Sequence, residues 1–471
     1  MRFNFRLYAC GLILVGLVGG CANVRPRASF EPVRRDVERR TGHRIRWYRG
    51  TAEDAGAGQE VREMLRDHLT VHEAVQVALL NNRRLQGLYE DLGVAQAELV
   101  EAGLLSNPVF EGSIRFNRGH RPAIDLAVVE EFISIFMIPL RRQAAAADVE
   151  RTKLEVTGRV MDLARRVTVE FYRHQGALQM LRMRRSVVDA TEASYRMSER
   201  LRDAGNATRL SVLQQRALHE QAKLDLSAAE LTVEESRERL NRLMGLWGPD
   251  VGWKVASRLP DIPSEGLDLE RVEQRAIENS VDLAMARRGL EATAGRVGIT
   301  DVESVLPELV VGAEAEREPD LQWEVGPALS LPLPLFDQGQ PERAAARGEF
   351  RRLWENYTAL AVEVRSAVRA ARHRLMVARR RVRYYQRVVV PLQKQILRQT
   401  QRRYNGMFLG VFQLLQAKQQ EIRTRRRSIE ELRNYWIART ELEQILAGRL
   451  VEGSGVSVST GGPIDRSAGG H

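Results

Sequence analysis

The sequence contains one long pattern twice, and this duplication constrains the fold more than any other feature. The corresponding positions are residues 69–82 with 267–280, Pro108 with Pro307, Pro139-Leu140 with Pro334-Leu335, and Gly205 with Gly406. Their offsets lie between 195 and 201 residues, so the register hardly changes over half of the chain. Because this period is far longer than one solenoid unit, each copy must be a module of several helices and strands. We therefore predict two repeats, 69–250 and 267–448, joined by a linker over 251–266.

The composition favours long amphipathic helices over thick globular cores. Hydrophobic residues make up 44% of the 471 residues and charged residues 28%, whereas aromatic residues reach only 6%. The formal net charge is +11, and 67 of the 72 basic residues are Arg. Basic runs such as 378–387 are compatible with nucleic-acid binding. An export signal at the N-terminus favours instead a solvated helix face in an Arg-biased proteome, so no nucleic-acid partner is expected.

Residues 1–20 have the features of a secretory signal. Arg2 and Arg6 lead into an apolar stretch, and small residues then precede Cys21. The segment resembles a bacterial lipoprotein signal, which implies that Cys21 carries a covalent lipid and becomes the first mature residue. Ala22 at the next position implies sorting to the outer membrane. The alternatives are an ordinary signal peptide and an apolar start that is not processed.

Cys21 is then the only cysteine of the mature chain, because Cys10 lies in the removed segment. An intramolecular disulfide and a cysteine-based metal site are therefore both excluded. The following residues, 21–68, are rich in Arg, Gly and Pro, and we expect a mostly extended, lipid-anchored N-terminal arm. Its one ordered patch is expected over 40–47.

Each repeat shows the same order of elements: helix, strand, strand, long helix and returning helix. In the first repeat the pattern predicts helices over 69–105, 139–203 and 210–244 and strands over 108–117 and 123–133. In the second repeat it predicts helices over 269–301, 341–404 and 411–447 and strands over 308–316 and 321–331. Thr70 and Glu73 form a capping box, Gly205 ends a long helix, and Pro391 should kink another. We expect the tail, 449–471, to be disordered.

The long helices carry apolar residues at steps of three and four, from Val364 to Val389 in the second repeat, as is typical of a coiled-coil seam. The first repeat has the same spacing from Val156 to Leu181, with the polar His174 at one of these positions. High charge on helices that must bury two flanking seams indicates a wall that is wet on both sides.

The predicted strands each have one apolar face. The apolar positions singled out are Phe110, Ile114, Phe116, Leu309, Val311, Trp323 and Val325. After the signal no apolar stretch reaches 18 residues, so only strands that close into a barrel could cross a membrane. Four strands are too few for closure; two chains would give eight strands around a core of side chains, and three would give twelve with room for a pore. The alternative is a small soluble sheet that caps a helical bundle.

Five stretches together resemble the TolC-type outer-membrane efflux proteins. They are Leu69–Val75 (LTVHEAV), Ser106–Val109 (SNPV), Ala204–Thr208 (AGNAT), Leu331–Phe336 (LPLPLF) and Tyr404–Ala417 (YNGMFLGVFQLLQA). Each is weak alone, but their order, with strands and long helices between them, is specific over about residues 69–447. The lipoprotein start, residues 40–47 and Phe336–Gln340 look most similar to the lipoprotein branch of heavy-metal efflux systems of the RND type.

The resemblance implies a mainly α-helical fold with a small transmembrane β part. Three chains would form a twelve-stranded β-barrel in the outer membrane, continued by a coiled-coil α-barrel into the periplasm. The turns at Gly205-Asn206 and Gly406-Met407 would form the periplasmic tip, which in the family contacts a periplasmic adaptor (membrane fusion protein) and an inner-membrane RND-type pump. The family often has an acid just after the tip, but Ser211 and Phe412 occupy that place here, which speaks against an acidic gate.

No catalytic or cofactor-binding motif occurs, so we expect no enzyme activity, no resident metal and no cofactor other than the lipid on Cys21. His68 and His72 at a helix start are better explained as unrelated histidines than as metal ligands. The predicted function is a passive outer-membrane exit duct for metal cations or small toxic solutes, driven by the pump. The alternative is a lipid-anchored periplasmic coiled-coil scaffold without a pore.

Overall fold

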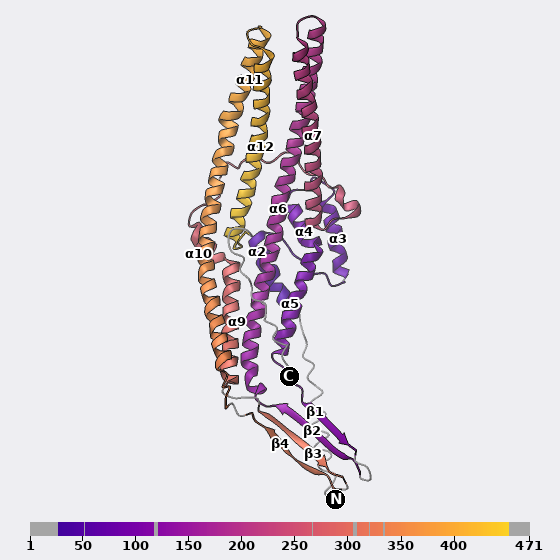
Figure 1. Ribbon diagram of the computed structural model, residues 1–471, viewed down its shortest axis with the longest axis vertical. Coiled ribbons are helices and arrows are strands. Elements are labelled where there is room, and N and C mark those ends of the chain that lie inside the picture. Colours follow the sequence, from indigo (N-terminus) through magenta and orange to yellow (C-terminus); the bar gives the residue numbers. More distant parts are fainter. Residues whose placement is uncertain are drawn as a thin grey trace. The chain divides into compact units, whose positions relative to one another are not determined.

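A computed structural model describes residues 27–50, 52–116, 121–265, 267–304, 309–319, 321–332 and 335–451. The predicted signal, Cys21 and residues 452–471 of the predicted tail lie outside these ranges. In chain order (Figure 1) the elements are α2 (Arg27–Thr41), α3 (Ala52–Met64), α4 (Val71–Asn81), α5 (Arg83–Glu101), β1 (Val109–Arg115), β2 (Ala123–Glu131), α6 (Ser134–Asp203), α7 (Arg209–Met244), the 3₁₀-helix η2 (Gly248–Gly252), α8 (Val272–Asn279), α9 (Val281–Glu303), β3 (Val310–Arg317), β4 (Glu324–Ser330), α10 (Gln340–Tyr384), the π-helix η3 (Tyr385–Val389), α11 (Val390–Asn405) and α12 (Val411–Ala447).

The chain forms two compact units, and each contains parts of both predicted repeats. The first, which we call the strand unit, comprises the chain before Arg34 together with Leu88–Val156 and Leu283–Ala359. The second, the hairpin unit, comprises Arg34–Gly87, Thr157–Asp282 and the chain from Leu360 onwards. The sheet, α5 and most of α9 belong to the strand unit, while α4, α7, α8, α11 and α12 belong to the hairpin unit. The long helices α6 and α10 contribute residues to both.

Two helical hairpins make up most of the hairpin unit: α6 returns as α7, and α11 returns as α12 (Figure 1). The predicted seam of α10 is buried, with Val364, Ala371 and Val382 each at most 2% exposed. Pro391 lies at the start of α11, directly after the π-helix η3. Because proline has no N–H to donate, a wider π-turn beside it removes a conflict that a regular α-helix would retain. The irregularity predicted at Pro391 takes this form.

The predicted first helix of each repeat is interrupted, and at equivalent places. Asn82 separates α4 from α5, and Ser280 separates α8 from α9. Asn82 has an extended backbone, and its Oδ1 accepts hydrogen bonds from the N–H groups of Arg84 and Leu85. A side chain that caps the next helix in this way ends the preceding one. The apolar spacing is continuous across the break and therefore predicts one helix where the structure has two.

Both breaks contact the end of a returning helix. Asn81 Nδ2 donates to Gly245 O at 2.8 Å, and Asn279 Nδ2 donates to Leu446 O at 3.1 Å. Gly245 (φ 68°) and Gly448 (φ 108°) end α7 and α12 in the left-handed conformation. A Cβ on Gly448 would lie 1.9 Å from Asn279 O, and a Cβ on Gly245 would lie 2.8 Å from Asn81 O. Close backbone approach therefore requires glycine at both positions, in addition to the positive φ.

Arg449, directly after α12, joins the end of the second repeat to α6 and to the start of α9. Its guanidinium donates to Asp162 Oδ2 at 2.8 and 3.1 Å and also pairs with Asp282. Both carboxylates are buried, and the Leu450 N–H donates to Asp282 at 2.8 Å. A buried carboxylate that lost its cation would be strongly unfavourable. The prediction that disorder begins at residue 449 is therefore wrong for the residues up to Val451.

The prediction of a mostly extended N-terminal arm is also wrong, because the arm contains the helices α2 and α3. The backbone of residues 44–48, between these helices, is held by two side-chain amides. Gln76 and Gln86 each bond to a backbone N–H and a backbone C=O of this segment, at distances between 2.8 and 3.0 Å. Val33 and Val37, one helical turn apart, are buried on α2. The high content of Arg, Gly and Pro masked this short apolar face.

The predicted linker is packed against the hairpins. Trp253 is 2% exposed, and its Nε1 donates to Asn241 Oδ1 on α7 at 2.7 Å. The Leu259 N–H donates to a side-chain oxygen of α6 at 3.0 Å, and Trp436 Nε1 on α12 donates to Pro260 O at 2.9 Å. One extended segment thus connects three of the long helices.

The four strands form one antiparallel sheet in the order β1-β2-β3-β4. Each repeat supplies one hairpin of two strands, and β2 pairs with β3 across the repeats. The strands have seven to nine residues, shorter than the sequence predicts. Within the described residues, β1 and β4 each pair on one side only, so both outer edges retain free backbone N–H and C=O groups.

We expect Gly448→Ala to destabilise the protein far more than Gly205→Ala. Both glycines have positive φ, a conformation that costs an L-residue about 1–2 kcal/mol. A Cβ at Gly205 would meet no heavy atom within 4 Å, whereas a Cβ at Gly448 would overlap Asn279 O. Chemical unfolding followed by circular dichroism measures the difference. Equal unfolding midpoints would show that the close contact at Gly448 does not exist.

Candidate functional site

The turn between α6 and α7 ends the first hairpin. Gly205 has φ 78°, and the Asn206 N–H donates to Leu201 O at 2.7 Å, which closes a Schellman-type turn. Thr208 caps α7, because its hydroxyl accepts a hydrogen bond from the Ser211 N–H at 3.2 Å. The backbone of this tip is therefore held by its own hydrogen bonds.

In the turn between α11 and α12, Met407 rather than Gly406 adopts the left-handed conformation (φ 63°). The Phe408 N–H donates to Arg403 O at 2.9 Å, as Asn206 does at the other tip. Gly406 has φ −83°, and a Cβ on it would lie 3.0 Å from the Phe408 ring. Glycine is needed here so that the ring can approach the backbone. The predicted equivalence of Gly205 with Gly406 is therefore wrong by one residue, and Gly205 corresponds to Met407.

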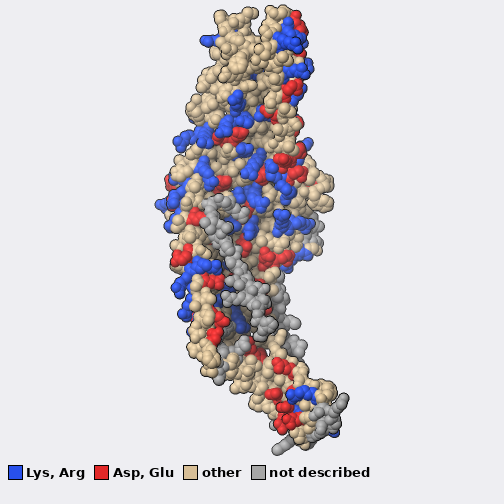
Figure 2. All heavy atoms as spheres, in the orientation of Figure 1, with Lys and Arg blue, Asp and Glu red and all other residues tan. Residues whose placement is uncertain are grey.

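The second tip exposes more apolar surface than the first. Met407, Phe408 and Phe412 are 91%, 83% and 65% exposed, whereas Leu210 is the main exposed apolar residue close to the first tip. Gly410, at the N-cap of α12, makes no side-chain cap bond, unlike its counterpart on α7. In Figure 2 the free end of α11 and α12 is covered mostly by uncharged residues, while acidic and basic side chains lie near the end of α6 and α7. The two tips thus offer different chemistry to a partner.

The register of the sheet places the predicted strand residues on one face. Phe110 lies opposite Val128, and Ala315 lies opposite Val325. Phe110, Ile114, Val311 and Val325 lie in strands, while Phe116, Leu309 and Trp323 lie directly beside strand ends and keep the same alternation. On the opposite face Arg115 pairs with Asp125 and Glu316, residues that alternate with the apolar ones. The sheet therefore has one apolar and one charged face, as its sequence predicts.

In the hairpin unit the long helices are arranged as a wall in the order α7, α6, α12, α10–α11. Between α7 and α6 lies a cluster of small and aliphatic side chains that includes Leu181 and Val233. Between α6 and α12, Tyr172 stacks on Trp436 with ring centroids 5.0 Å apart. Between α12 and α10, Arg381 pairs with Glu431 at 3.8 Å. The two outer helices of this wall, α7 and α10–α11, each have a neighbour in the wall on one side only.

Lys418 links the two hairpins near their tips. From α12 its Nζ donates to Ser194 Oγ at 2.9 Å and to Ala190 O at 3.2 Å, both on α6. Burial lowers the pKa of Lys418 below its ordinary value, while nearby Glu421 acts in the opposite direction. Lys418 is one of only five lysines in the chain. That rarity was the only sequence signal for this contact, which sequence reasoning missed.

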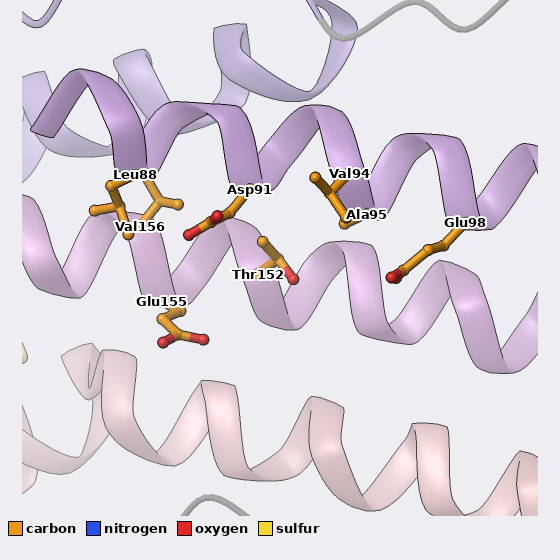
Figure 3. Close-up of a pocket in the computed structure, with 8 residues that line it drawn as sticks. All are labelled: Leu88, Asp91, Val94, Ala95, Glu98, Thr152, Glu155 and Val156. Carbon is orange, nitrogen blue, oxygen red and sulfur yellow. The ribbon is translucent and has the colours of Figure 1, made fainter. Parts of the chain in front are cut away.

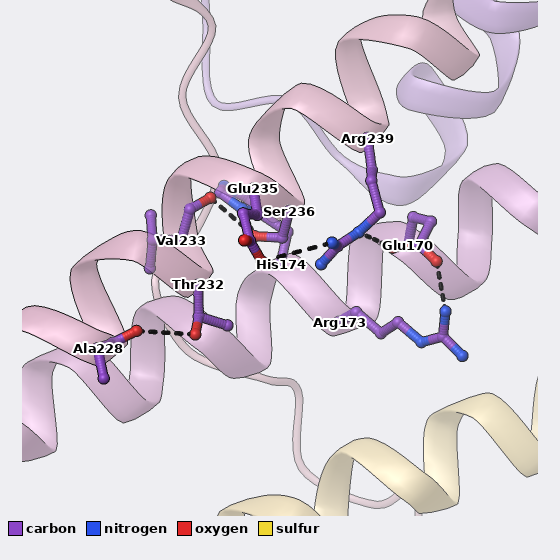
Figure 4. A network of polar contacts seen from close by, with 9 residues as sticks. All are labelled: Glu170, Arg173, His174, Ala228, Thr232, Val233, Glu235, Ser236 and Arg239. Atoms are coloured by element: carbon purple, nitrogen blue, oxygen red, sulfur yellow. Dashed lines mark hydrogen bonds and ion pairs between the residues drawn. The ribbon is translucent and has the colours of Figure 1, made fainter. Parts of the chain in front are cut away.

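His174 on α6 and Ser236 on α7 face one another in a buried network (Figure 4), with His174 Nδ1 2.7 Å from Ser236 Oγ. The His174 ring has no exposed surface and packs edge-on against Trp253 of the linker, with centroids 5.3 Å apart. Beside it, Glu170 pairs with Arg173 at 2.5 Å and with Arg239 at 3.2 Å. Burial lowers the pKa of His174 to about 4, and the positive charge of Arg237 adds to the effect.

In the strand unit a pocket lies between α5 and α6 (Figure 3). Its lining includes the carboxylates of Asp91, Glu98 and Glu155 beside Leu88 and Val156. Burial raises the pKa of Asp91, and the negative charge of Glu155 raises it further. Over the described residues no group of three or more His, Cys, Asp and Glu has the geometry of a metal site. The acidic pocket is therefore a local electrostatic feature without assigned chemistry.

Of the helices in the described part of the chain, none has a stretch both long and apolar enough to cross a membrane.

We expect stability to fall between pH 6.5 and pH 4, and His174→Gln to flatten this dependence. In the unfolded chain His174 takes up a proton near pH 6.5, whereas in the folded protein it stays neutral down to about pH 4. The unfolded state then binds more protons within this window, so stability is complete above pH 6.5 and decreases as the pH falls, by at most about 3 kcal/mol. Thermal melts across the window test this, with the exposed His373→Gln as control. The same slope in His174→Gln and wild type would contradict it.

The sequence matches the family of outer membrane efflux proteins over residues 136–246 and 272–448. These two segments make up more than half of the chain, and each lies inside one predicted repeat. No curated protein matches the chain.

Solved structures show the same fold at low sequence identity. CusC, whose structures concern transmembrane channel formation, is 17% identical, with a TM-score of 0.68 over 80% of this chain and 92% of that one. A membrane protein from Pseudomonas aeruginosa is 19% identical (TM-score 0.67; 80% and 93% covered), and the CmeC outer membrane channel of Campylobacter jejuni is 16% identical (TM-score 0.68; 81% and 86% covered). With this fold, and with the family pattern matched in both repeats, the chain belongs to the outer membrane efflux protein family, whose members are transport conduits rather than enzymes.

Proposed function

We propose that the protein is the outer-membrane exit duct of a tripartite efflux system and works as a homotrimer. The single observation that carries this proposal is that the chain has free edges at both ends of its sheet and of its helical wall. A wall or a sheet with two complementary free edges closes into a ring when copies associate head to tail. The family to which the chain belongs supports a ring that conducts solutes.

The sheet supplies the first pair of edges. The free edge of β1 would pair with the free edge of β4 from the next copy, and three copies would give a barrel of twelve strands. The apolar face would then meet lipid: Phe110 is 67% exposed, Ile114 57% and Val325 76% in the single chain. The charged face with Arg115 and Asp125 would line a water-filled lumen.

The helical wall supplies the second pair of edges. On α7 the exposed leucines follow the side opposite to the buried seam, and Leu224 (66% exposed) and Leu231 (62%) stand seven residues apart. On α10 and α11 a comparable row of exposed residues includes Tyr384 (59%) and Leu392 (49%). Apolar rows on the outer sides of a helical wall favour burial against another helix. We therefore expect α7 of one copy to pack against α10–α11 of the next.

The tips would contact a periplasmic adaptor, through which an inner-membrane RND-type pump drives export. The exposed side chains of Met407, Phe408 and Phe412 and the Gly205-Asn206 turn are the surfaces that we assign to this contact. Lys418 would hold the two hairpins together near this end. The absence of an acid at Ser211 and Phe412 argues that any gate at the tip relies on apolar contacts.

Anchoring and cargo complete the proposal. A covalent lipid on Cys21 would fix the chain to the outer membrane, with a large periplasmic part. Metal cations or small toxic solutes would be the substrates, because the sequence is most similar to the heavy-metal branch of the family. A lipid-anchored periplasmic scaffold without a pore is the other candidate, but family membership speaks against it.

Planar-bilayer recording tests the duct directly. We expect the purified, detergent-stable trimer to insert and to give discrete conductance steps, because a closed ring of strands with a charged inner face leaves a water-filled path. A stable trimer that inserts but gives no conductance would contradict the proposal and leave the scaffold as the better account.

Aspartate at the outer edge of α7 should prevent trimer formation. Leu224→Asp places a charge in the proposed contact between copies, whereas Thr232→Asp adds the same charge to an exposed side of α7 away from the leucine row. We expect Leu224→Asp to elute as a monomer and Thr232→Asp as a trimer in size-exclusion chromatography with light scattering. If Leu224→Asp stays trimeric, α7 does not form the interface.

A further inference from the structure

The second hairpin contains a long segment without acidic residues. Between Val364 and Gln420 the chain has fourteen Lys and Arg residues and no Asp or Glu. The corresponding part of the first hairpin has five acids, Glu170, Asp189, Glu192, Glu199 and Asp203. The two hairpins have the same architecture but different charge, so helix formation alone does not account for the difference.

Six of these basic residues form a row along α10 and α11. We call Arg380, Arg383, Arg387, Lys394, Arg398 and Arg402 the basic ridge. All six are exposed, and their steps of three, four and seven residues keep them on one side of the helix. From the first to the last, the row extends over about 33 Å. A linear array of this length is large enough to contact a helix of some twenty residues.

The ridge differs from the arginines that face α12. Arg374 and Arg381, on another side of α10, pair with Glu441 and Glu431 of α12 at 3.4 and 3.8 Å. Within the described ranges, no carboxylate forms an ion pair with a residue of the basic ridge. The packing of the hairpin therefore uses the first group of cations and leaves the ridge available.

The linker shows what this side of α10 binds. Arg379, next to the first ridge residue, donates to Pro263 O at 3.5 Å and to Ser264 O at 3.1 Å. Further along the same side, Arg369 pairs with Glu273, just inside α8, at 3.0 Å. Carbonyl and carboxylate oxygens of polypeptide thus already occupy the part of this side nearest to the ridge. A side covered by the linker also lies outside any lumen that the wall encloses, because the linker would otherwise obstruct it.

We propose that the basic ridge is a docking surface for an acidic α-helix of a partner protein. A helix with a glutamate on every turn presents carboxylates at the same pitch as the ridge presents cations. Arginine favours this partner, because its planar guanidinium binds carboxylates through two parallel hydrogen bonds. Each exposed pair contributes at most about 1 kcal/mol, so the complex depends on several pairs at once and on low salt.

A binding assay with a designed peptide tests the ridge. The probe is a fluorescent 24-residue helical peptide with Glu at successive i and i+4 positions, and its control has Gln at the same positions. We expect the Glu peptide to bind the full-length protein in detergent and to weaken at least tenfold when salt rises from 50 to 500 mM, while the Gln peptide does not bind. Absence of binding by the Glu peptide at low salt would overturn the proposal.

Matched variants locate the contact. Arg380→Gln/Arg383→Gln/Arg387→Gln should weaken binding at least tenfold. Arg173→Gln/Arg196→Gln/Arg216→Gln, which removes the same charge from exposed positions of the first hairpin, should change it less than twofold. Equal losses in the two variants would mean that net charge alone attracts the peptide, and the ridge would not be a site.

Two further measurements keep the test decisive. If the triple variant does not fold, judged by its melting curve, Arg387→Glu should weaken the Glu peptide and regain affinity for a peptide with one central Glu→Lys exchange. Failure of this exchange would count against the ridge. Wild type that binds vesicles with anionic phospholipid or soluble peptidoglycan fragments through the ridge, but not the Glu peptide, would show another class of partner. Channel conductance of the same variants reports separately on the duct.

Discussion

Every long helix of this protein has to bury apolar residues on two opposite sides, and the other features of the structure depend on that constraint. A single long amphipathic helix is only marginally stable in water without such burial. α6 and α12 satisfy both sides within the chain, α6 against α7 and α12, and α12 against α6 and α10. The outer helices satisfy one side only, so the chain by itself is an incomplete wall.

The sheet repeats this logic with hydrogen bonds in place of apolar contacts. β2 and β3 have partners on both sides, whereas β1 and β4 each retain a free edge. Free edges are a liability that proteins normally cover. A chain with free edges on both its sheet and its wall can remove all of them through one head-to-tail association. The duplication therefore supplies inner elements that are complete and outer elements that require another copy.

The sequence was sufficient for those parts of the fold in which periodicity carries the information. The hairpins, the strand faces and the capping box at Thr70 follow from spacing, because burial acts on whole rows of residues. The breaks at Asn82 and Ser280 and the helices of the arm depend on single side chains or short apolar rows, which periodicity averages away. The register at Met407 depends on where one aromatic ring packs, so aligning glycines placed the tip one residue away.

The two repeats agree in their buried contacts and differ on their exposed surfaces. Asn81 against Gly245 and Asn279 near Gly448 are nearly the same contact, made twice. The tips and the charges, in contrast, are unlike: apolar at Met407 and Phe408, hydrogen-bonded at Thr208, and basic without acids along α10 and α11. Internal packing therefore explains the shared features, and it cannot explain the differences, because those side chains point to solvent. The cause of the asymmetry must be sought in what the outside of each hairpin contacts, which the two hairpins of one chain need not share.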